Sequence, residues 1–279
     1  MVYDSMRPAI FLHGGSGSWT GKDTNKALKI LEKAATTGLS TMEEGGSAVD
    51  AVEKSINHLE ISGDFIAGRG SLPQFDGVIR IDAGIAYGKT GKVGAVASIE
   101  DVIKPVSVAR KVMEETDYVL LVGSGATEFA KEHGFFCRIN KSKKSYTNSC
   151  ETVGAVACDF NGNLAAGSST GGLPDALPGR VGDAPIFGAG FYVNKHAAAA
   201  CTGKGEYFIK TLLAEHACNL VANGLKPDEA TKQSMKYLVN RCGIEAWGGI
   251  IVLDCNGNYG YDHNTEKMPI CYKSIDRLK

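Results

Sequence analysis

Residues 151–190 read ETVGAVACDFNGNLAAGSSTGGLPDALPGRVGDAPIFGAG, and they contain the clearest structural pattern of the chain. Two apolar, β-rich runs, residues 152–159 and 163–168, are separated by the pair Asn161-Gly162. An Asn-Gly pair flanked by two such runs is the strongest short-range sign of a β-hairpin. We therefore expect a hairpin that begins at Thr152 and ends in a loop rich in serine, threonine and glycine.

A second hairpin of the same design is expected near the C-terminus. Residues Gly249–Asp254 and Tyr259–Asp262 flank the turn Asn256-Gly257-Asn258. The similarity suggests that both hairpins belong to one antiparallel sheet system. Between them, one helix is expected from about Gly205 to Asn223 and another from Pro227 onward. A succession of strands, helices and strands favours sheets whose outer faces are covered by helices.

The first half of the chain alternates between strand and helix patterns. Apolar residues recur at three- and four-residue steps around Leu31 and around Val52, which indicates two amphipathic helices. Residues 135–151 lose this periodicity and become polar, so we expect a flexible linker there and a boundary between residues 1–151 and 152–279. The other elements expected are a strand Ala9–Leu12, strands Val78–Asp82 and Lys92–Ala97 joined by a turn at Gly88–Gly91, a helix from Pro105, a buried strand Tyr118–Val122 and a short helix Thr127–His133.

The bulk composition excludes several classes of protein. The 279 residues are 43% hydrophobic, which is enough for a buried core, and the formal net charge is −1. Nucleic-acid binding needs a concentrated basic surface, and the single basic cluster, Arg138 to Lys144, is better explained as part of the linker. No run approaches the ~18 apolar residues that span a membrane. The lack of a visible secretory signal, and of any C-x-x-C pair among the eight cysteines, favours reduced thiols in a cytoplasmic protein.

Two familiar catalytic patterns do not fit. Residues 167–171, GSSTG, match the G-x-S-x-G motif of hydrolases, but that motif must lead from a strand into a helix, and here Leu173-Pro174-Asp175 continues as a loop. The six histidines show no spacing typical of metal ligands, so a catalytic metal has little support. His13, which ends the first strand before Gly14-Gly15, is interpreted as a structural residue.

Thr152 can act as a nucleophile only with a base beside it. If the peptide bond before it were cut, its own α-amine would be that base. Such an amine has a reference pKa of about 7.7–8.0, so part of it is deprotonated near neutral pH. The residue types and spacing alone favour a simpler interpretation, in which Thr152 is one of the β-branched residues that are common in strands.

Longer segments carry more information than any single residue. They are His13-Gly14-Gly15, Ala67–Ser71, Asp82-Ala83, Gly94–Ala97, Leu121–Gly123, Thr152–Ala157, Gly162–Ala166, Ser169–Gly172, Pro178–Asp183 and Cys201–Glu206. In this order and combination they resemble the plant-type asparaginase/isoaspartyl peptidase family of N-terminal-nucleophile hydrolases. The resemblance extends over nearly the whole chain.

This resemblance implies an α+β fold, the four-layer αββα sandwich. It also implies a precursor that cuts itself between Glu151 and Thr152. The products would be an α half, residues 1–151, and a β half, residues 152–279, which stay together as one domain. Members of the family usually form a dimer of such pairs, so self-association is expected.

The resemblance also implies roles for seven residues and one loop. Thr152 would be the nucleophile, and Thr170 would support it. Thr202 and Gly203 would form the oxyanion hole. Arg180 would bind the α-carboxylate of the substrate, Asp183 would bind its α-ammonium, and Gly205 would line the pocket. No cofactor is required. A structural Na⁺ is implied in a loop that includes Leu59, Glu60, Phe65 and Ala67.

The implied function is hydrolysis of the side-chain amide of L-asparagine and of β-aspartyl dipeptides, through an ester on Thr152. These small molecules would be the partners of the protein. Among several departures from the family pattern, Glu151 stands where glycine is usual and Ile66 where asparagine is usual. Two alternatives therefore stay open, a glycosylasparaginase-like amidohydrolase and a poorly maturing homologue that acts as a binding protein.

Overall fold

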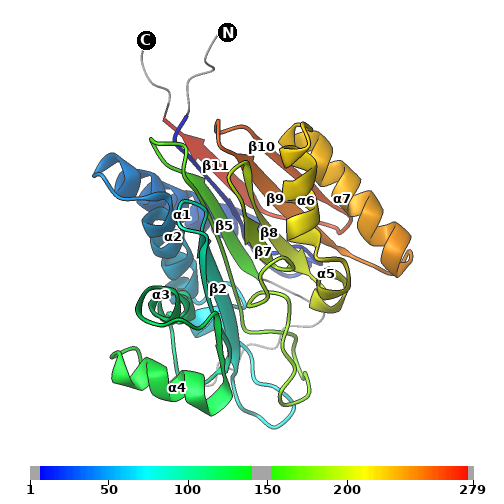
Figure 1. Cartoon of the computed structure of the whole chain (residues 1–279). Helices are drawn as coiled ribbons and strands as arrows, with labels where there is room; N and C mark the ends of the chain where they lie inside the picture. The colour runs from blue at the N-terminus through cyan, green and yellow to red at the C-terminus, as the bar shows by residue number, and fades with distance from the viewer. Residues whose placement is uncertain (1–6, 140–151, 276–279) are drawn as a thin grey trace.

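Two β-sheets lie face to face in the computed structural model, which describes residues 7–139 and 152–275 (Figure 1). Within these residues the larger sheet has seven strands in the order β11-β1-β5-β6-β2-β3-β4, and the smaller has four in the order β10-β9-β8-β7. The larger sheet consists of β1 (Ala9–His13), β2 (Ile81–Tyr87), β3 (Lys92–Ile99), β4 (Leu120–Val122), β5 (Val153–Cys158), β6 (Leu164–Thr170) and β11 (Ile270–Ser274). The smaller consists of β7 (Phe191–Val193), β8 (Ala197–Gly203), β9 (Gly248–Asp254) and β10 (Tyr259–His263).

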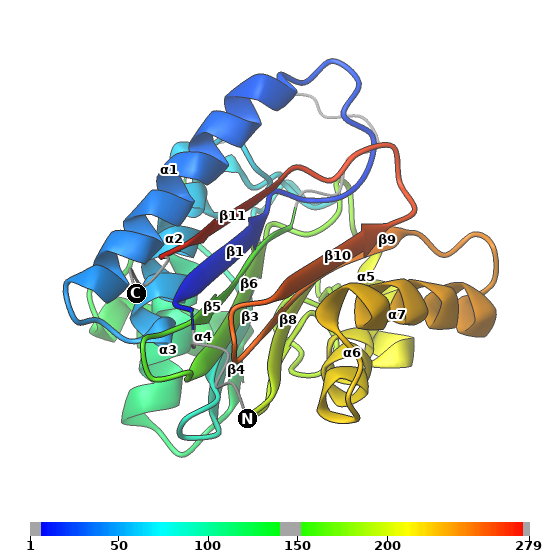
Figure 2. The same ribbon diagram turned by 90° about the horizontal axis from the view of Figure 1, so that it is seen from above.

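Helices cover the faces of the sheets that point away from each other (Figures 1 and 2). The larger sheet is covered by α1 (Thr24–Glu43), α2 (Ala48–Ser62), α3 (Pro105–Glu115) and α4 (Gly123–Glu132). The smaller sheet is covered by α5 (Gly205–Thr211), α6 (Leu213–Ala222) and α7 (Pro227–Cys242). The fold is therefore mixed α+β. Across residues 7–139 and 152–275, no helix combines the length and the apolar character needed to cross a bilayer.

Strand β1 shows how the core is divided. Ile10 and Leu12 belong to the core between the larger sheet and its helices, whereas Ala9 and Phe11 belong to the core between the two sheets. Successive side chains of a strand point to opposite faces, so a strand covered on both sides is apolar throughout. This is why β1 is completely buried and its sequence shows no alternation of polar and apolar residues.

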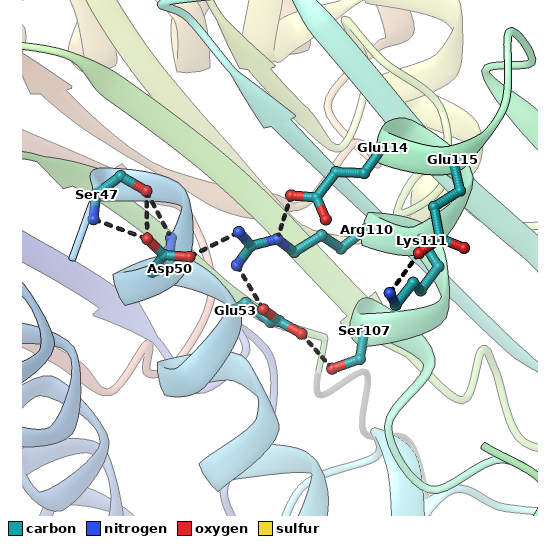
Figure 3. A network of polar contacts seen from close by, with 8 residues as sticks. All are labelled: Ser47, Asp50, Glu53, Ser107, Arg110, Lys111, Glu114 and Glu115. Carbon is teal, nitrogen blue, oxygen red and sulfur yellow. Dashed lines mark hydrogen bonds and ion pairs between the residues drawn. The ribbon is translucent and has the colours of Figure 1, made fainter. Parts of the chain in front are cut away.

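A polar network joins α2 to α3 (Figure 3). The guanidinium of Arg110 donates to Glu53 at 2.6 Å and to Glu114 at 2.8 Å, and it lies 2.6 Å from a carboxylate oxygen of Asp50. Asp50 also closes a capping box with Ser47 at the start of α2. A guanidinium has five N–H donors, so a partly buried one needs several acceptors. The network holds the two helices together on the outside of the helical layer.

The two Asn-Gly hairpins form as expected, but in different sheets. β5 pairs with β6 in the larger sheet, whereas β9 pairs with β10 in the smaller one. In each turn one aspartate, Asp159 or Asp254, accepts hydrogen bonds from the backbone N–H groups two and four residues later. The local sequence sets these turns, but the sheet that a hairpin joins depends on contacts with distant segments. The prediction that both belong to one sheet system was wrong.

Two strand predictions are also corrected. The strand predicted over Val78–Asp82 begins only at Ile81, because the residues before it form a loop in which Arg80 donates to Gln74 at 2.8 Å. The turn predicted at Gly88–Gly91 does follow β2, and β3 begins at Lys92 as expected. The strand predicted as buried over Tyr118–Val122 is β4, which pairs in parallel with β3 at the edge of the sheet and leaves Val122 57% exposed.

The single helix predicted from Gly205 to Asn223 is broken at Leu212. This residue has φ 46° and ψ 52°, in the left-handed region, and it separates α5 from α6. A left-handed conformation costs an L-residue roughly 1–2 kcal/mol. No glycine or proline marks the break, so the apolar pattern predicts one continuous helix.

Replacing Leu212 with glycine is expected to stabilise the protein by about 0.5–1 kcal/mol, because glycine adopts this conformation without strain and loses only part of that gain to its greater freedom when unfolded. The side chain of Leu212 is 43% exposed, so little packing is lost. Thermal unfolding measures the effect. In the control Lys210→Gly, glycine enters the regular part of α5 and should instead destabilise by about 1 kcal/mol. A Leu212→Gly variant that is less stable than the wild type would contradict the conclusion that Leu212 is strained.

The linker predicted over residues 135–151 is described only as far as Ile139. The N–H of Cys137 donates to the carbonyl of Asp101 at 2.7 Å, and the N–H of Ile139 donates to the Asp101 side chain at 3.2 Å. The first residues of the predicted linker are therefore bonded to the loop that follows β3. The rest, including most of the basic cluster and Glu151, lies outside the described residues.

Candidate active site

Thr152 lies immediately before β5, and only 1% of its surface is exposed. β5 pairs with β6 in a register that sets Val153 opposite Ser169. Continued by one residue, this register sets Thr152 opposite Thr170, at the same end of the two strands. The hairpin therefore brings together two threonines that are 18 positions apart in the sequence. Glu151, on the other side of the proposed cleavage point, lies outside the described residues.

Thr170 is buried at the end of β6, and its hydroxyl oxygen accepts a hydrogen bond from the N–H of Gly172 at 3.1 Å. A hydroxyl has one O–H donor in addition to its acceptor lone pairs. The bond from Gly172 therefore leaves the proton of Thr170 available to a neighbour. In the described part of the chain, no hydrogen bond joins the side chains of Thr170 and Thr152.

His13 lies on the other side of Thr152, at the end of β1. It pairs with Gly154 of β5, and its ring occupies the space that a side chain at that position would need. Burial lowers the pKa of His13 to about 3, although contact with the backbone of Thr152 acts in the opposite direction. The imidazole is therefore neutral near neutral pH. His13 borders Thr152 as a neutral group and supplies no positive charge there.

Thr202 and Gly203 end β8 in the smaller sheet, which faces β5. The two sheets approach each other closely where Gly154 faces Ala200, because a Cβ on Gly154 would lie 2.9 Å from the Cβ of Ala200. Thr202 is completely buried, and its hydroxyl oxygen accepts a hydrogen bond from the N–H of Ser16 at 3.1 Å. Ser16 follows β1 at the end of the larger sheet where Thr152 lies. Thr152 and Thr202 are thus at the same end of the two facing sheets.

The loop between β6 and β7 carries Arg180, which forms a paired contact with α5. Its Nε donates to one carboxylate oxygen of Glu206 at 3.1 Å and its Nη2 to the other at 3.2 Å. Asp82, at the start of β2, accepts from the N–H groups of Ser98 at 2.8 Å and Gly182 at 3.0 Å. The polar loop is therefore held from two sides, by Glu206 through its arginine and by Asp82 through its backbone.

Asp183 is a buried acid of this loop, and one of its carboxylate oxygens has no hydrogen-bond partner in the described part of the chain. It is 3% exposed, and its Oδ2 has no hydrogen-bond partner among residues 7–139 and 152–275. Burial raises the pKa of Asp183 to about 7; its own backbone N–H and Arg180 act against this shift, and the charges of Asp82 and Glu206 add to it. Burial likewise raises the pKa of Asp82 to about 6. A buried carboxylate oxygen without a hydrogen-bond partner favours the binding of a cation.

Gly205 begins α5 and is packed directly against Asp183. A Cβ on Gly205 would lie 2.6 Å from Oδ1 of Asp183 and 2.8 Å from its backbone nitrogen. Sequence resemblance predicts that Gly205 lines the substrate pocket. Its closest described contacts are with Asp183, so the lack of a side chain at Gly205 is what lets Asp183 occupy its position.

Changing Gly205 to alanine is expected to lower kcat/KM about 100-fold, because a group displaced by about 1 Å can cost that much. The measurement is steady-state hydrolysis of asparagine, the substrate that the sequence resemblance implies. Gly125→Ala is a matched control, since Gly125 lies in α4 and a Cβ there would meet nothing within 4 Å. Unchanged kinetics in Gly205→Ala would show that Asp183 does not need its present position.

Sequence resemblance implies Na⁺ in a loop that includes Leu59, Glu60, Phe65 and Ala67. Leu59 and Glu60 belong to the last turn of α2, and only Phe65 and Ala67 lie in the loop after it. The carbonyls of Leu59, Phe65 and Ala67 each accept one hydrogen bond, at 2.7, 2.8 and 3.1 Å. Each carbonyl has a second lone pair. The side chain of Glu60 points to another element and accepts a hydrogen bond from the N–H of Val106 at 3.2 Å. Burial raises the pKa of Glu60 to about 8, while the hydroxyl of Ser169 and the N–H of Val106 act against this shift. No group of three or more His, Cys, Asp or Glu side chains suited to a metal occurs in the described residues.

Three residues that hold the candidate site residues in place were not identified from the sequence. Ser16, Asp82 and Glu206 belong to recognisable segments, but their spacing alone does not show what they contact. Each makes a hydrogen bond across at least 26 positions of sequence. Their partners are set by strand register and by the stacking of the sheets, so a pattern search along the chain cannot find them.

Comparison with known proteins gives sequence matches over most of the chain. The family described as asparaginase matches residues 6–137 and 137–279. The chain is 39% identical to a plant-type L-asparaginase of Pyrobaculum calidifontis, over 93% of this chain and 94% of that protein. It is also 39% identical to a plant-type L-asparaginase of Pyrococcus furiosus, over 95% of each chain. An isoaspartyl peptidase/L-asparaginase of Danio rerio is 35% identical over 94% of this chain and 91% of its own length.

These matches extend through both halves of the chain and across all the segments that build the site. The protein is therefore an enzyme of the asparaginase class. More particularly, it belongs to the plant-type asparaginase/isoaspartyl peptidase family.

Proposed function

We propose that this protein is a self-processing threonine hydrolase that acts on L-asparagine and β-aspartyl dipeptides, with Thr152 as its nucleophile. The observation that carries the proposal is the register of β5 and β6, which sets Thr152 opposite Thr170 at the end of the sheet where Ser16 contacts Thr202. The arrangement of two facing sheets between helices supports the αββα sandwich of N-terminal-nucleophile hydrolases. Two cleaved molecules are expected to associate as a dimer of αβ pairs.

Self-cleavage is proposed to begin with attack by Oγ of Thr152 on the carbonyl carbon of residue 151. The peptide C–N bond breaks, its nitrogen takes up the hydroxyl proton, and the chain is then joined through an ester. Water then hydrolyses that ester, which leaves a carboxyl group on residue 151, restores the hydroxyl of Thr152 and keeps the α-amine that the shift has freed. A hydroxyl needs an adjacent base to be a good nucleophile, and this amine is such a base.

In turnover, Oγ of Thr152 attacks the side-chain carbonyl carbon of the substrate. The hydroxyl proton passes through the α-amine to the leaving nitrogen, which departs as ammonia or as the amine of an amino acid. Thr202 and the N–H of Gly203 stabilise the negative charge that develops on the carbonyl oxygen. Water then attacks the β-aspartyl ester, releases aspartate and restores the free hydroxyl.

Arg180 and Asp183 are proposed to recognise the α-carboxylate and α-ammonium of the substrate. A guanidinium binds a carboxylate with two parallel hydrogen bonds. The buried Oδ2 of Asp183, which has no partner in the described part of the chain, supports a role in binding an ammonium group. Together the two charges select amino-acid-like substrates with a free α-amine.

The last turn of α2 and the loop after it, residues 59–69, are proposed to hold a structural Na⁺. Its carbonyl oxygens fit a hard cation, which prefers oxygen ligands. The carbonyl of Glu60 faces Gly68 so closely that a Cβ there would lie 2.7 Å from it. Leu59, Glu60, Phe65 and Ala67 would supply the ligands. The ion would neutralise their dipoles and order the loop that leads to Ser71, which packs against Gly171 beyond β6.

Electrophoresis and two substrate assays test the proposal. Purified protein should separate on an SDS gel into fragments of about 16 and about 13.5 kDa, in proportion to 151 and 128 of the 279 residues of a 29.5-kDa chain. It should release ammonia from asparagine and leucine from β-aspartyl-leucine. One uncleaved band that persists for days, without hydrolysis, would instead support a binding protein. Hydrolysis of glycosylasparagine in preference to both substrates would support the glycosylasparaginase-like alternative.

A further inference from the structure

Ser16 makes two hydrogen bonds to the same distant residue. Its N–H donates to Oγ1 of Thr202 at 3.1 Å, and its hydroxyl donates to the backbone carbonyl of Thr202, also at 3.1 Å. Both residues are completely buried, and 186 positions of sequence separate them. Two bonds between one pair of residues fix their orientation as well as their distance. The loop after β1 is therefore attached to the end of β8 by Ser16.

The first bond determines where the hydroxyl proton of Thr202 can point. A hydroxyl offers one donor and two acceptor lone pairs, and the N–H of Ser16 occupies one lone pair. Among the described residues, the hydroxyl of Thr202 donates no hydrogen bond. A buried donor needs an acceptor, so its proton is available to a group that enters the site from outside the chain.

The second bond determines the orientation of a peptide group. The carbonyl of Thr202 and the N–H of Gly203 belong to one planar trans peptide, in which the two groups point in opposite directions. The hydroxyl of Ser16 holds this carbonyl and thereby limits rotation of the whole plane. Ser16 thus acts on both groups that sequence resemblance assigns to the oxyanion hole.

We propose that Ser16 is a positioning residue for the oxyanion hole, which directs the hydroxyl of Thr202 and the N–H of Gly203 toward the substrate carbonyl. This inference rests on the proposed function and adds a residue to it. Among the described residues, Ser16 makes no hydrogen bond to the side chain of Thr152. Because Ser16 belongs to residues 1–151 and Thr202 to residues 152–279, the two bonds join separate chains after cleavage.

The variant Ser16→Ala removes the hydroxyl and keeps the N–H. Preorganised donors act mainly on the transition state, and removal of one costs about 100- to 1,000-fold in kcat. Loosening a donor should cost less, so we expect kcat for asparagine to fall about tenfold with KM unchanged within twofold. Rates are expressed per cleaved chain, as measured by SDS gel, so that a change in self-cleavage does not enter the value.

The matched control is Ser55→Ala. Ser55 is also completely buried, and its hydroxyl donates to the carbonyl of Ala34 at 3.0 Å, between α2 and α1 and away from the site. Both variants should lose a similar amount of thermal stability, but only Ser16→Ala should lose kcat. In a Thr202→Val background, Ser16→Ala should still lower kcat, because it loosens the peptide that carries the N–H of Gly203, and this N–H is retained.

The outcomes separate this inference from the function on which it rests. If the wild type hydrolyses asparagine and Ser16→Ala retains kcat within twofold, the role of Ser16 is refuted and the proposed function stands. The same holds if Ser55→Ala lowers kcat as much as Ser16→Ala does, which would indicate a general effect of losing a buried hydrogen bond. A wild type that hydrolyses neither asparagine nor β-aspartyl-leucine overturns the proposed function and this inference with it.

Discussion

Replacing Thr152 with alanine is expected to stop both self-cleavage and hydrolysis. The variant lacks Oγ, the atom that would carry both proposed esters, and it should purify as a single chain of 29.5 kDa. Hydrolysis of asparagine should fall by at least about four orders of magnitude, as is typical when a catalytic nucleophile is removed. An SDS gel and an ammonia-release assay measure the two effects.

Thr152→Ser is the matched control, since it keeps the hydroxyl and removes one buried methyl group. It should still cleave and should keep part of the activity. Thermal unfolding checks that both variants fold, because truncation at a site that is 1% exposed costs about 1–2 kcal/mol. A Thr152→Ala chain that still splits before residue 152 would refute the cleavage mechanism. One that still hydrolyses asparagine would exclude Thr152 as the nucleophile of turnover.

The second large effect is expected for Asp183→Asn, which keeps the shape of the side chain and removes its charge. Loss of one partner from a buried charge pair costs about 2–5 kcal/mol, so kcat/KM for asparagine should fall at least about 30-fold and up to several thousand-fold. In the wild type, kcat/KM should rise as the pH rises through about 7, since only the ionised carboxylate of Asp183 attracts an ammonium group. This part of the pH profile should be absent in the variant.

The same substitution is expected to stabilise the free protein at alkaline pH. Burial raises the pKa of Asp183 from 3.8 to about 7, so between these values the folded state binds more protons than the unfolded state. The free energy of unfolding therefore decreases as the pH rises from about 4 to about 7 and stays low above that range. The side-chain amide of asparagine does not ionise, so above pH 7 the variant should be more stable by about 4 kcal/mol. Below pH 4 the two proteins should be similar.

Unfolding curves at pH 4 and pH 8, without substrate, measure this difference. Asp159→Asn is a matched control, because Asp159 is also 3% exposed but accepts hydrogen bonds from the N–H groups of Asn161 and Asn163. An amide accepts at one oxygen only, so this variant should be destabilised at both pH values. An Asp183→Asn variant that is less stable than wild type at pH 8 would show that the charge of Asp183 is compensated in the free protein.

Short-range patterns predicted the elements that depend on neighbouring residues. The Asn-Gly turns, the helix that begins at Pro105 and the strand that ends at His13 all have local physical causes, and the structure confirms them. The failures have a different origin. Leu212 adopts a left-handed conformation that its side chain does not favour, and β4 is an edge strand because no further strand follows it in the sheet order.

The residues of the candidate site also divide into those that the sequence identified and those that only the folded chain reveals. Thr152, Arg180 and Asp183 were named from sequence resemblance, because they lie in segments that can be matched along the chain. Ser16, Asp82 and Glu206 were assigned no role, because each acts through a partner that only the folded chain brings near. A carboxylate such as Asp82 looks the same in the sequence whether it is exposed or holds the backbone of a distant loop.

By itself, the sequence determined the family of the protein, its mixture of strands and helices, and the threonine at the start of the central hairpin. Only the tertiary structure decided that the two hairpins belong to different sheets, that Thr170 stands opposite Thr152, and that Ser16 holds Thr202. The physical reason is that periodicity and turn chemistry act over a few residues. Strand register and the stacking of two sheets act between segments that are up to 186 positions apart.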